Sequence, residues 1–447
     1  MVGGKLKNWE IRRNLQSVTG SLSLPGPHDV TRHTLSNGLT VLVRENHASP
    51  TVVFRGYVKA GGLCDTDETA GLAGLTAYTA RRGTATRTFH EINEAVESVG
   101  ASLNMGANKQ AAGFSGKSLS EDLPLLVDIA ADILQRPSFP ETELEKVRGQ
   151  VITSLRQLED NTQRKANREF RAICYPAGHP YARSTEGALE TVERLQRDDL
   201  LTFYERFYSP RSTVMTVVGD VEADKVIPRL EDAFGDWQAP GDDAPYDIPP
   251  APRPSGTQQV VVPMFNKTQA DIVWGLPALS RFSDDYYAAR VANTILGQVG
   301  LMGRLGANVR DKQGLAYYAS SGLEGGLGPG PWIVYAGVAP GDVDRAVESI
   351  LIEIARLRKE LVIEEELADA QDYITGILPL SLETNHGVAG ALIEIEMYGL
   401  GLDFLARYPG LIRAVTREDV QAVAQKYLDT ENYALAIAGP YGTPAEA

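Results

Sequence analysis

The sequence is poor in the residues that build disulfide scaffolds and histidine-based metal centres. Its 447 residues include two cysteines, Cys64 and Cys174, and six histidines. Neither cysteine belongs to a C-x-x-C pair, so we expect two reduced, partly buried thiols and no disulfide framework. The histidines are scattered along the chain, and their spacing indicates no metal site.

The sequence also lacks long apolar runs. No window approaches the roughly 18 uninterrupted apolar residues of a transmembrane helix, so we expect no membrane partner. The N-terminal stretch MVGGKLKNWEIRRNLQS has no apolar segment typical of a signal peptide. The cytoplasm is therefore the expected location.

Positive charge is in deficit. The chain carries 43 Lys and Arg against 58 Asp and Glu, which gives a formal net charge of −15 and a pI near 5.0. This balance argues against nucleic acid as a partner, because phosphate binding requires a basic surface. At long range it would favour basic or neutral peptides. No P-loop, G-x-S-x-G elbow or dinucleotide fingerprint supports an unrelated chemistry.

Proline is concentrated in one segment. Residues 238–256 read QAPGDDAPYDIPPAPRPSG and contain six of the 25 prolines. Such a segment is extended and semi-rigid, so we interpret it as an interdomain linker. It separates a first domain at 27–237, preceded by an N-terminal arm at 1–26, from a second domain at 257–447. Each has the size of a single domain.

The two halves contain similar stretches in the same order. The pairs are LEKVRGQVITSL (144–155) with LADAQDYITGIL (367–378), VERLQRDDLLTFYERFY (192–208) with AVTREDVQAVAQKYL (414–428), and STVMTVVGDV (212–221) with YALAIAGPYG (433–442). Three pairs in one order, each offset by about 220 residues, indicate a tandem duplication.

The first half mixes strand and helix patterns. The predicted strands cover 39–46 and 51–61, and the predicted helices cover 71–82, a Ser-capped stretch at 118–135 and a stretch that begins at Pro140. In the last helix, Ser154 lies on the same side as Val147 and Val151 and therefore faces inward. Strands mixed with paired helices, without a βαβ rhythm, favour an α+β fold.

The most informative stretch is RLGANVRDKQGLAYYAS at 304–320. Its Arg310 and Tyr317 resemble the Arg/Tyr motif in the C-terminal half of pitrilysin-type (insulinase-type) zinc peptidases, the inverzincins. The resemblance implies that both side chains reach a peptide that is being cut at a zinc ion. Tyr318 is the adjacent alternative. Neighbours on a strand point to opposite faces, so only one tyrosine can face the substrate, and the spacing favours Tyr317.

The zinc motif of that family is degraded here. The family pattern G-x-A-H-F-L-E-H-M-x-F-K-G-T corresponds to GLAGLTAYTARRGT at 71–84. The two ligand positions of H-x-x-E-H fall on Gly74 and Tyr78, the general base falls on Ala77, and the third ligand falls on Ser154. These residues supply neither the ligand set nor the base of a zinc peptidase. We therefore expect no metal and no other cofactor in this chain.

The resemblance covers most of the chain and implies two tandem homologous domains. Each is expected to be a mostly antiparallel sheet backed by helices, and together they would form a half-shell that closes against another half-shell. Some family members work as pairs of unlike chains, one with zinc and one with the Arg/Tyr pair, and this chain matches the second kind.

We therefore predict the non-zinc subunit of a heterodimeric zinc endopeptidase, inactive alone. Arg310 and Tyr317 would act in trans on unfolded peptides, for substrate binding and oxyanion stabilisation. The expected partner is a homologous subunit with an intact H-x-x-E-H, which holds the zinc. The alternative is a catalytically inactive scaffold or assembly protein of the same fold.

Overall fold

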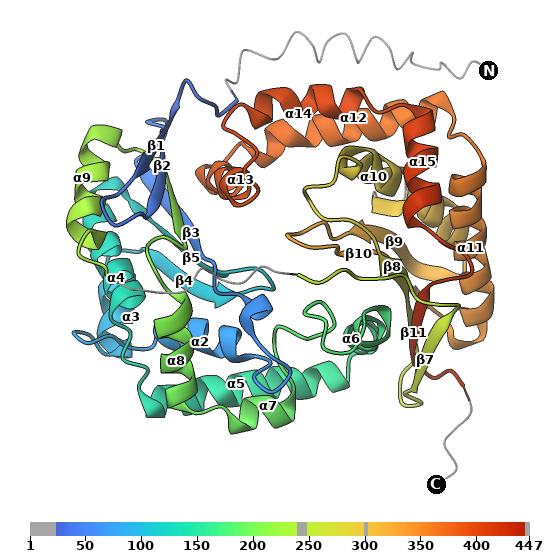
Figure 1. The fold of residues 1–447 in the computed structure, drawn as a ribbon, viewed down its shortest axis with the longest axis horizontal. Coiled ribbons are helices and arrows are strands. Elements are labelled where there is room, and N and C mark those ends of the chain that lie inside the picture. Colours follow the sequence, from blue (N-terminus) through green and yellow to red (C-terminus); the bar gives the residue numbers. More distant parts are fainter. Residues whose placement is uncertain (1–23, 239–247, 299–302, 443–447) are drawn as a thin grey trace, which may run out of the picture.

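The computed structural model describes residues 24–238, 248–298 and 303–442. Figure 1 shows two lobes side by side, each built from one β-sheet and a set of helices. The first sheet uses strands from the N-terminal half of the chain, and the second uses strands from the C-terminal half. Residues 239–247 of the expected linker and 1–23 of the expected arm lie outside the described residues.

The first sheet has six strands in the order β1-β2-β6-β3-β5-β4. Neighbouring strands are antiparallel except β2 and β6, which run parallel. The central strand β6, TVMTVVG, is buried along its whole length, which explains its unbroken apolar and β-branched character. The strands are β1 (Val30–Thr34), β2 (Thr40–Glu45), β3 (Thr51–Val58), β4 (Ser102–Ala107), β5 (Ala112–Leu119) and β6 (Thr213–Gly219).

The second sheet repeats this arrangement. Its order is β7-β11-β8-β10-β9, with β7 and β11 parallel and the other described pairs antiparallel. The strands are β7 (Gln258–Pro263), β8 (Ala270–Pro277), β9 (Ala316–Leu323), β10 (Pro331–Val338) and β11 (Ala434–Gly439). Five strands of one sheet thus have counterparts in the other, which confirms the predicted α+β fold of two similar, mostly antiparallel sheets.

The helices follow the same repeat. In the first half they are α2 (Leu72–Ala80), α3 (Phe89–Ser98), α4 (Leu123–Gln135), α5 (Glu141–Glu159), α6 (Thr162–Cys174), α7 (Leu189–Arg194), α8 (Arg197–Phe207) and α9 (Ala223–Phe234). In the second half they are α10 (Tyr286–Asn293), α11 (Val343–Lys359), α12 (Glu364–Ser381), α13 (Asn385–Met397), α14 (Phe404–Arg413) and α15 (Arg417–Tyr427). The paired sequence stretches lie in α5 and α12, α8 and α15, and β6 and β11. None of the helices in the described segments has the length and apolar character needed to cross a bilayer.

One predicted helix starts later than the sequence suggested. The Ser-capped helix expected at 118–135 is α4, which begins at Leu123. Ser118 belongs to β5, and its hydroxyl donates to the carbonyl of Leu119 instead of accepting a hydrogen bond from a helix amide. A short 3-10 turn separates the strand from the helix. Pro140 likewise precedes α5 and is not its first residue.

Helix α6 belongs to the first half of the chain but packs on the second sheet (Figure 1). Its Ala166, Phe170 and Cys174 are buried together with apolar residues of β8, β10 and β11. Gly275 of β8 permits the close approach, because a Cβ atom there would lie 2.9 Å from the Phe170 ring and 2.4 Å from the Trp332 carbonyl oxygen. A first-half helix therefore completes the core of the second lobe.

Helix α13 makes the reciprocal contact. It belongs to the second half and packs on β3 and β6 of the first sheet. Val388, Ala389 and Leu392 share a core with apolar residues of that sheet. At the start of the helix, the Asn385 side chain donates to the backbone carbonyl of Thr51 at 3.3 Å. Each sheet is thus covered on one face by a helix of the other half.

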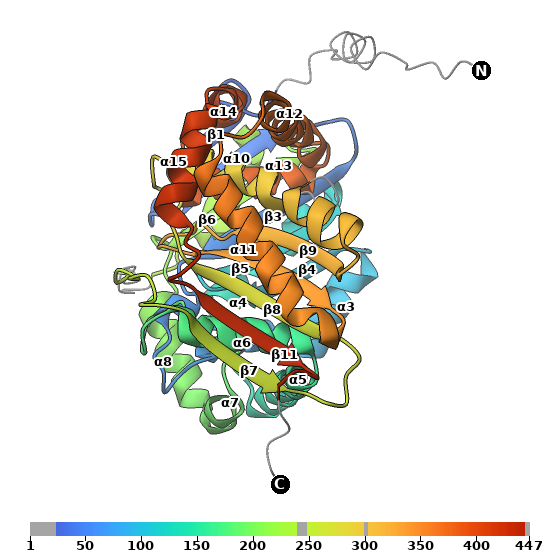
Figure 2. The same ribbon diagram turned by 90° about the vertical axis from the view of Figure 1, so that its right-hand side faces the viewer.

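Helices of the same half cover the opposite faces. Figure 2 shows α11 crossing the second sheet. In the first lobe, α4 and α9 pack together over β5 and β2. Each sheet is therefore the middle layer of its lobe, between helices of both halves.

A buried carboxylate ties α4 to the turn that follows α2. Asp132 is fully buried and accepts hydrogen bonds from Thr84, Thr86, Arg87 and Arg136. Burial opposes ionisation, but these hydrogen bonds and positive charges outweigh it, so the pKa of Asp132 lies below its usual value. The carboxylate thereby ties the turn at 84–87 to α4.

Removing this carboxylate should destabilise the protein. We expect Asp132→Ala to lower the free energy of unfolding by roughly 3 kcal/mol at neutral pH, because it leaves buried donors without an acceptor. A carboxylate with a lowered folded-state pKa adds stability above its unfolded pKa of about 4 and loses it as the pH falls through the folded value. Urea unfolding of wild type and variant should therefore show a smaller difference at about pH 3.

The matched control is Asp128→Ala, one turn earlier on α4. The Asp128 side chain is 46 % exposed and pairs with Arg229. Its removal should cost less than about 1 kcal/mol. Equal losses for the two variants would contradict the role given to Asp132.

Candidate functional site

Helix α2 carries the degraded motif, and its start is fixed by a buried carboxylate. Asp65 accepts hydrogen bonds from the backbone amides of Gly71 and Ala73, both at 3.0 Å. Burial raises the pKa of Asp65 to about 7, although these two hydrogen bonds oppose the rise. Gly71 has φ of 98°, a conformation that favours glycine. The residues around the motif thus still set the helix, although the ligand positions have changed.

The degraded positions surround one cavity. Gly74 and Tyr78 on α2 and Ser154 on α5 line a cavity of about 520 Å³, which also borders strand β4. Ala77, the fourth position, is fully buried on the same helix. We call this space the α2–α5 cavity. Two helices that are distant in the sequence therefore bring three of the four predicted positions to one space.

The side chains around the α2–α5 cavity do not fit a zinc ion. A catalytic zinc needs three protein ligands, and its water needs a carboxylate base. The four positions offer a phenol, a hydroxyl, a methyl group and a hydrogen atom. The cations of Arg81, Arg82 and Lys109 line the same space and would repel a bound metal ion. Among the described residues, no group of three or more His, Cys, Asp or Glu is placed to hold a metal.

Tyr78 occupies the second lost ligand position and points towards β4. A Cβ atom added at Gly106 of β4 would come within 3.2 Å of the Tyr78 ring. The side chain is 45 % exposed, and its hydroxyl makes no hydrogen bond with the described residues. Within the described part of the chain, this phenol therefore has a proton that it can donate to a ligand in the cavity.

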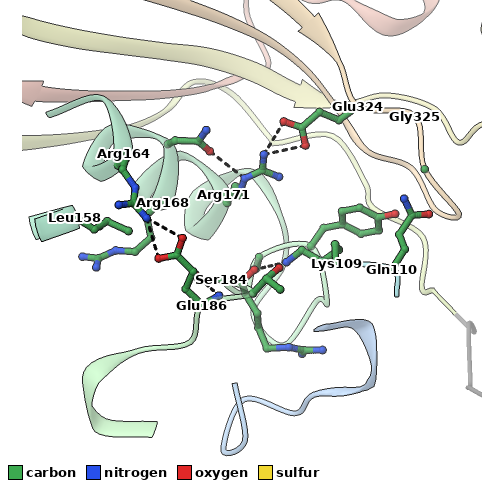
Figure 3. A pocket seen from close by; sticks show the side chains of 16 residues that line it. Lys109, Gln110, Leu158, Arg164, Arg168, Arg171, Ser184, Glu186, Glu324 and Gly325 are labelled. Atoms are coloured by element: carbon green, nitrogen blue, oxygen red, sulfur yellow. Dashed lines mark hydrogen bonds and ion pairs between the residues drawn. The ribbon is translucent and has the colours of Figure 1, made fainter. Parts of the chain in front are cut away.

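A second cavity of about 480 Å³ adjoins the first and shares Lys109, Thr185 and Glu186 with it. Figure 3 shows its ion pairs. Arg171 on α6 donates to both carboxylate oxygens of Glu324 at 2.7 and 2.8 Å, and Arg164 donates to both of Glu186 at the same distances. We call this space the α6 cavity. Its arginines are balanced by carboxylates.

Sequence reasoning missed the α6 cavity. Its walls come from α6, the segment around Tyr181–Glu186 and the loop that joins β9 to β10, which are far apart in the chain. The available signal was the spacing of Arg164, Arg168 and Arg171, which places three guanidinium groups on one face of a helix. That spacing does not predict which elements of the fold face the three guanidinium groups.

Arg310 and Tyr317 lie on consecutive elements, the helical turn Gly306–Lys312 and the first residues of β9. Both side chains are exposed, Tyr317 to 65 %. Neither makes a hydrogen bond or ion pair with any of the described residues. Tyr318 differs, because it is half-buried and its hydroxyl donates to the Asp271 carboxylate. Of the two neighbouring tyrosines, Tyr317 is the accessible one.

The chain folds into two lobes of similar architecture, and the α2–α5 cavity of the first lobe has a lining that does not fit a zinc ion. Two family models match the chain. The model described as Insulinase (Peptidase family M16) matches residues 40–188, and the model described as Peptidase M16 inactive domain matches residues 194–374. The chain belongs to the M16 peptidase family.

Similar proteins match over nearly their full lengths. An uncharacterized zinc protease of Streptomyces coelicolor is 28 % identical over 92 % of this chain and 90 % of its own. Mitochondrial-processing peptidase subunit beta of Lentinula edodes is 25 % identical over 98 % of this chain and 96 % of its own. A solved structure, a peptidase M16 inactive domain from Pseudomonas fluorescens, has a TM-score of 0.85 and 24 % identity, and it covers 94 % of this chain and 100 % of that chain. This last likeness shows the fold.

Restoring the lost ligands should create a zinc site. Gly74→His, Tyr78→His and Ser154→Glu, combined in one chain, should bind about one zinc ion, because the three positions line one cavity and two imidazoles with a carboxylate form a complete ligand set that outweighs the repulsion from the nearby cations. A side chain at Gly74 finds room, since a Cβ atom there would meet the Thr185 carbonyl oxygen at 3.4 Å. Zinc content after dialysis, measured by atomic absorption, reports the result.

The control is Gly74→His alone, which supplies a single ligand and should retain almost no zinc. A combined variant that folds normally and retains no more zinc than this control would show that the three positions do not converge on one metal-sized space.

Proposed function

We propose that this chain is the zinc-less subunit of a two-chain metalloendopeptidase, inactive alone. Arg310 and Tyr317 would act in trans on an unfolded peptide held at the zinc of a homologous partner with an intact H-x-x-E-H. The observation that carries the proposal is that both side chains are exposed and lack a partner among the described residues. Groups held in this way are free to donate to a molecule outside the chain.

The chemistry of the two groups suits peptide hydrolysis. Attack of water on the scissile carbonyl places negative charge on its oxygen, and donors aimed at that oxygen stabilise the transition state. A guanidinium and a phenol both donate hydrogen bonds at neutral pH without a change of protonation. Zinc in the partner would supply the activated water and polarise the carbonyl.

The relatives support a division of labour between unlike chains. The Streptomyces relative is named a zinc protease, and the Lentinula relative is named as one subunit of a processing peptidase. In this chain the ligand positions of α2 and α5 cannot hold the metal, whereas the Arg/Tyr pair persists in the second lobe. A partner that carries the zinc would supply the metal ligands and the general base that this chain lacks.

The test uses the zinc-bearing homologue from the same organism and a quenched, unstructured peptide. We expect cleavage to require both chains. Arg310→Ala and Tyr317→Phe should each lower kcat/KM of the pair roughly 10²-fold, as the loss of an oxyanion donor does. Size-exclusion chromatography of the mixture checks that the complex still forms.

The matched controls are Lys312→Ala, an exposed cation on the same turn, and Tyr373→Phe, an exposed phenol on α12. Both should leave kcat/KM within twofold of wild type. If the homologue is equally active alone, or if Arg310→Ala behaves like Lys312→Ala, the alternative holds and the chain is a scaffold or assembly protein of the same fold.

A further inference from the structure

The α2–α5 cavity contains positive charge that no carboxylate in it balances. Arg81, Arg82 and Lys109 line the space, and the acidic residue among its lining residues is Glu186. Both oxygens of Glu186 already accept hydrogen bonds from Arg164, at 2.7 and 2.8 Å. The cavity therefore carries a net positive charge, although the chain as a whole carries −15.

The two arginines have weak or neutral partners. The nearest carboxylate oxygen to Arg82 among the described residues belongs to Glu143, at 3.8 Å, and its guanidinium also donates to the Gln150 side chain at 3.0 Å. Arg81 donates to the amide oxygen of Asn93 at 2.9 Å. The Nε of Arg81 is buried without a hydrogen-bond partner in the described part of the chain. Burial, followed by the charge of Arg82, lowers the pKa of Arg81, and the charge of Glu97, which forms no ion pair with Arg81 among the described residues, opposes this shift.

Lys109 lies where the two cavities meet. Its ammonium group donates to the backbone carbonyls of Pro180, at 3.2 Å, and Arg183. No carboxylate of the described residues forms an ion pair with it, and an ammonium group has a third hydrogen to donate. Burial, with the charges of Arg171 and Arg183, lowers its pKa to about 8, so it remains mainly protonated at neutral pH.

Neutral donors complete the lining. The phenol of Tyr78, the hydroxyl of Ser154 and the amide of Gln150 all border the cavity. Such a set of donors suits an anion, because each can hydrogen-bond to a carboxylate oxygen and the guanidinium groups add charge-assisted bonds. The α6 cavity next to it is different, since its Arg171 is already paired with Glu324.

We propose that the α2–α5 cavity binds a carboxylate of the substrate peptide, so that this chain selects acidic peptides. The inference rests on the proposed function, because it takes the ligand to be a peptide. Two features favour a peptide over a small free anion. The cavity, at about 520 Å³, is far larger than a phosphate ion, and part of its wall is apolar, from Leu75, Met105 and Val151. It also borders β4, an edge strand whose outer backbone groups can pair with an extended chain.

The test measures binding to this chain alone, by fluorescence anisotropy. The probes are a labelled unstructured peptide with several Glu residues and the same peptide with each Glu replaced by Gln. At about 0.15 M salt, where charges more than about 8 Å apart are screened, the Glu peptide should bind roughly tenfold more tightly. In the double variant Arg81→Gln, Arg82→Gln this preference should disappear, while binding of the Gln peptide stays within twofold.

The matched control is Lys225→Gln, Arg229→Gln, which removes two positive charges from α9 and should keep the preference. Should the double variant at the cavity fail to fold, Arg82→Gln alone is used, because it leaves in place Arg81, whose Nε is buried, with Arg82→Lys as the rescue. Inorganic phosphate is added as a competitor to test for a small-anion site.

Four results would overturn the proposal. They are equal binding of the two peptides, no measurable binding of the Glu peptide, a preference that survives the cavity variants, and displacement of the Glu peptide by submillimolar phosphate. Because no partner chain is present, the result is independent of whether this chain stimulates a zinc-bearing homologue. If this chain prefers the Glu peptide but does not stimulate cleavage by the zinc-bearing homologue, the proposed function is contradicted and the anion site is still supported.

Discussion

The structure depends on a reciprocal exchange of two helices. Helix α6, from the first half of the chain, covers the second sheet, and α13, from the second half, covers the first. Neither sheet therefore has a complete apolar core within its own half. The exchange also shapes the cavities, because α6 forms a wall of the space that adjoins the degraded zinc position. A half that lost its partner would lose the helix that covers one face of its sheet, and the first half would also lose the β9–β10 loop that borders the α6 cavity.

The sequence predicted the repeat and the α+β fold from particular residues, but it predicted only part of the element order and missed helices such as α3 and α6. β-branched runs marked β2 and β3, and the matched stretches in α5 and α12 marked the duplication. The start of α4 was wrong, because Ser118 fits a strand end as well as a helix cap. The exchange itself was beyond the sequence, since an apolar stripe on α6 shows which face is buried and not which sheet receives it. For the same reason, the sequence assigned Gly74 and Ser154 to ligand positions of the family pattern, but it could not show that Arg81, Arg82 and Lys109 line the same cavity.

The charge of the chain illustrates the difference between global and local electrostatics. A net charge of −15 describes the field far from the surface, where salt screens it within about 8 Å under physiological conditions. Inside the α2–α5 cavity the nearest groups are Arg81, Arg82 and Lys109, and their field has the opposite sign. A site that holds a metal cation is lined by electron-rich ligands. The cavity beside Gly74, Tyr78 and Ser154 is instead lined by hydrogen-bond donors and cations.

The equivalence of α6 and α13 bears on the ancestry of the chain. Each follows the long helix of its half, α5 or α12, and each lies on the sheet of the other half. Two separate copies of one half-length chain, trading this helix, would form a symmetric swapped dimer with the same two cores. Fusion of the two genes would then release the copies from symmetry. One copy could lose metal ligands while the other kept Arg310 and Tyr317. In such a history, the two halves would have been partners before they were neighbours in one sequence.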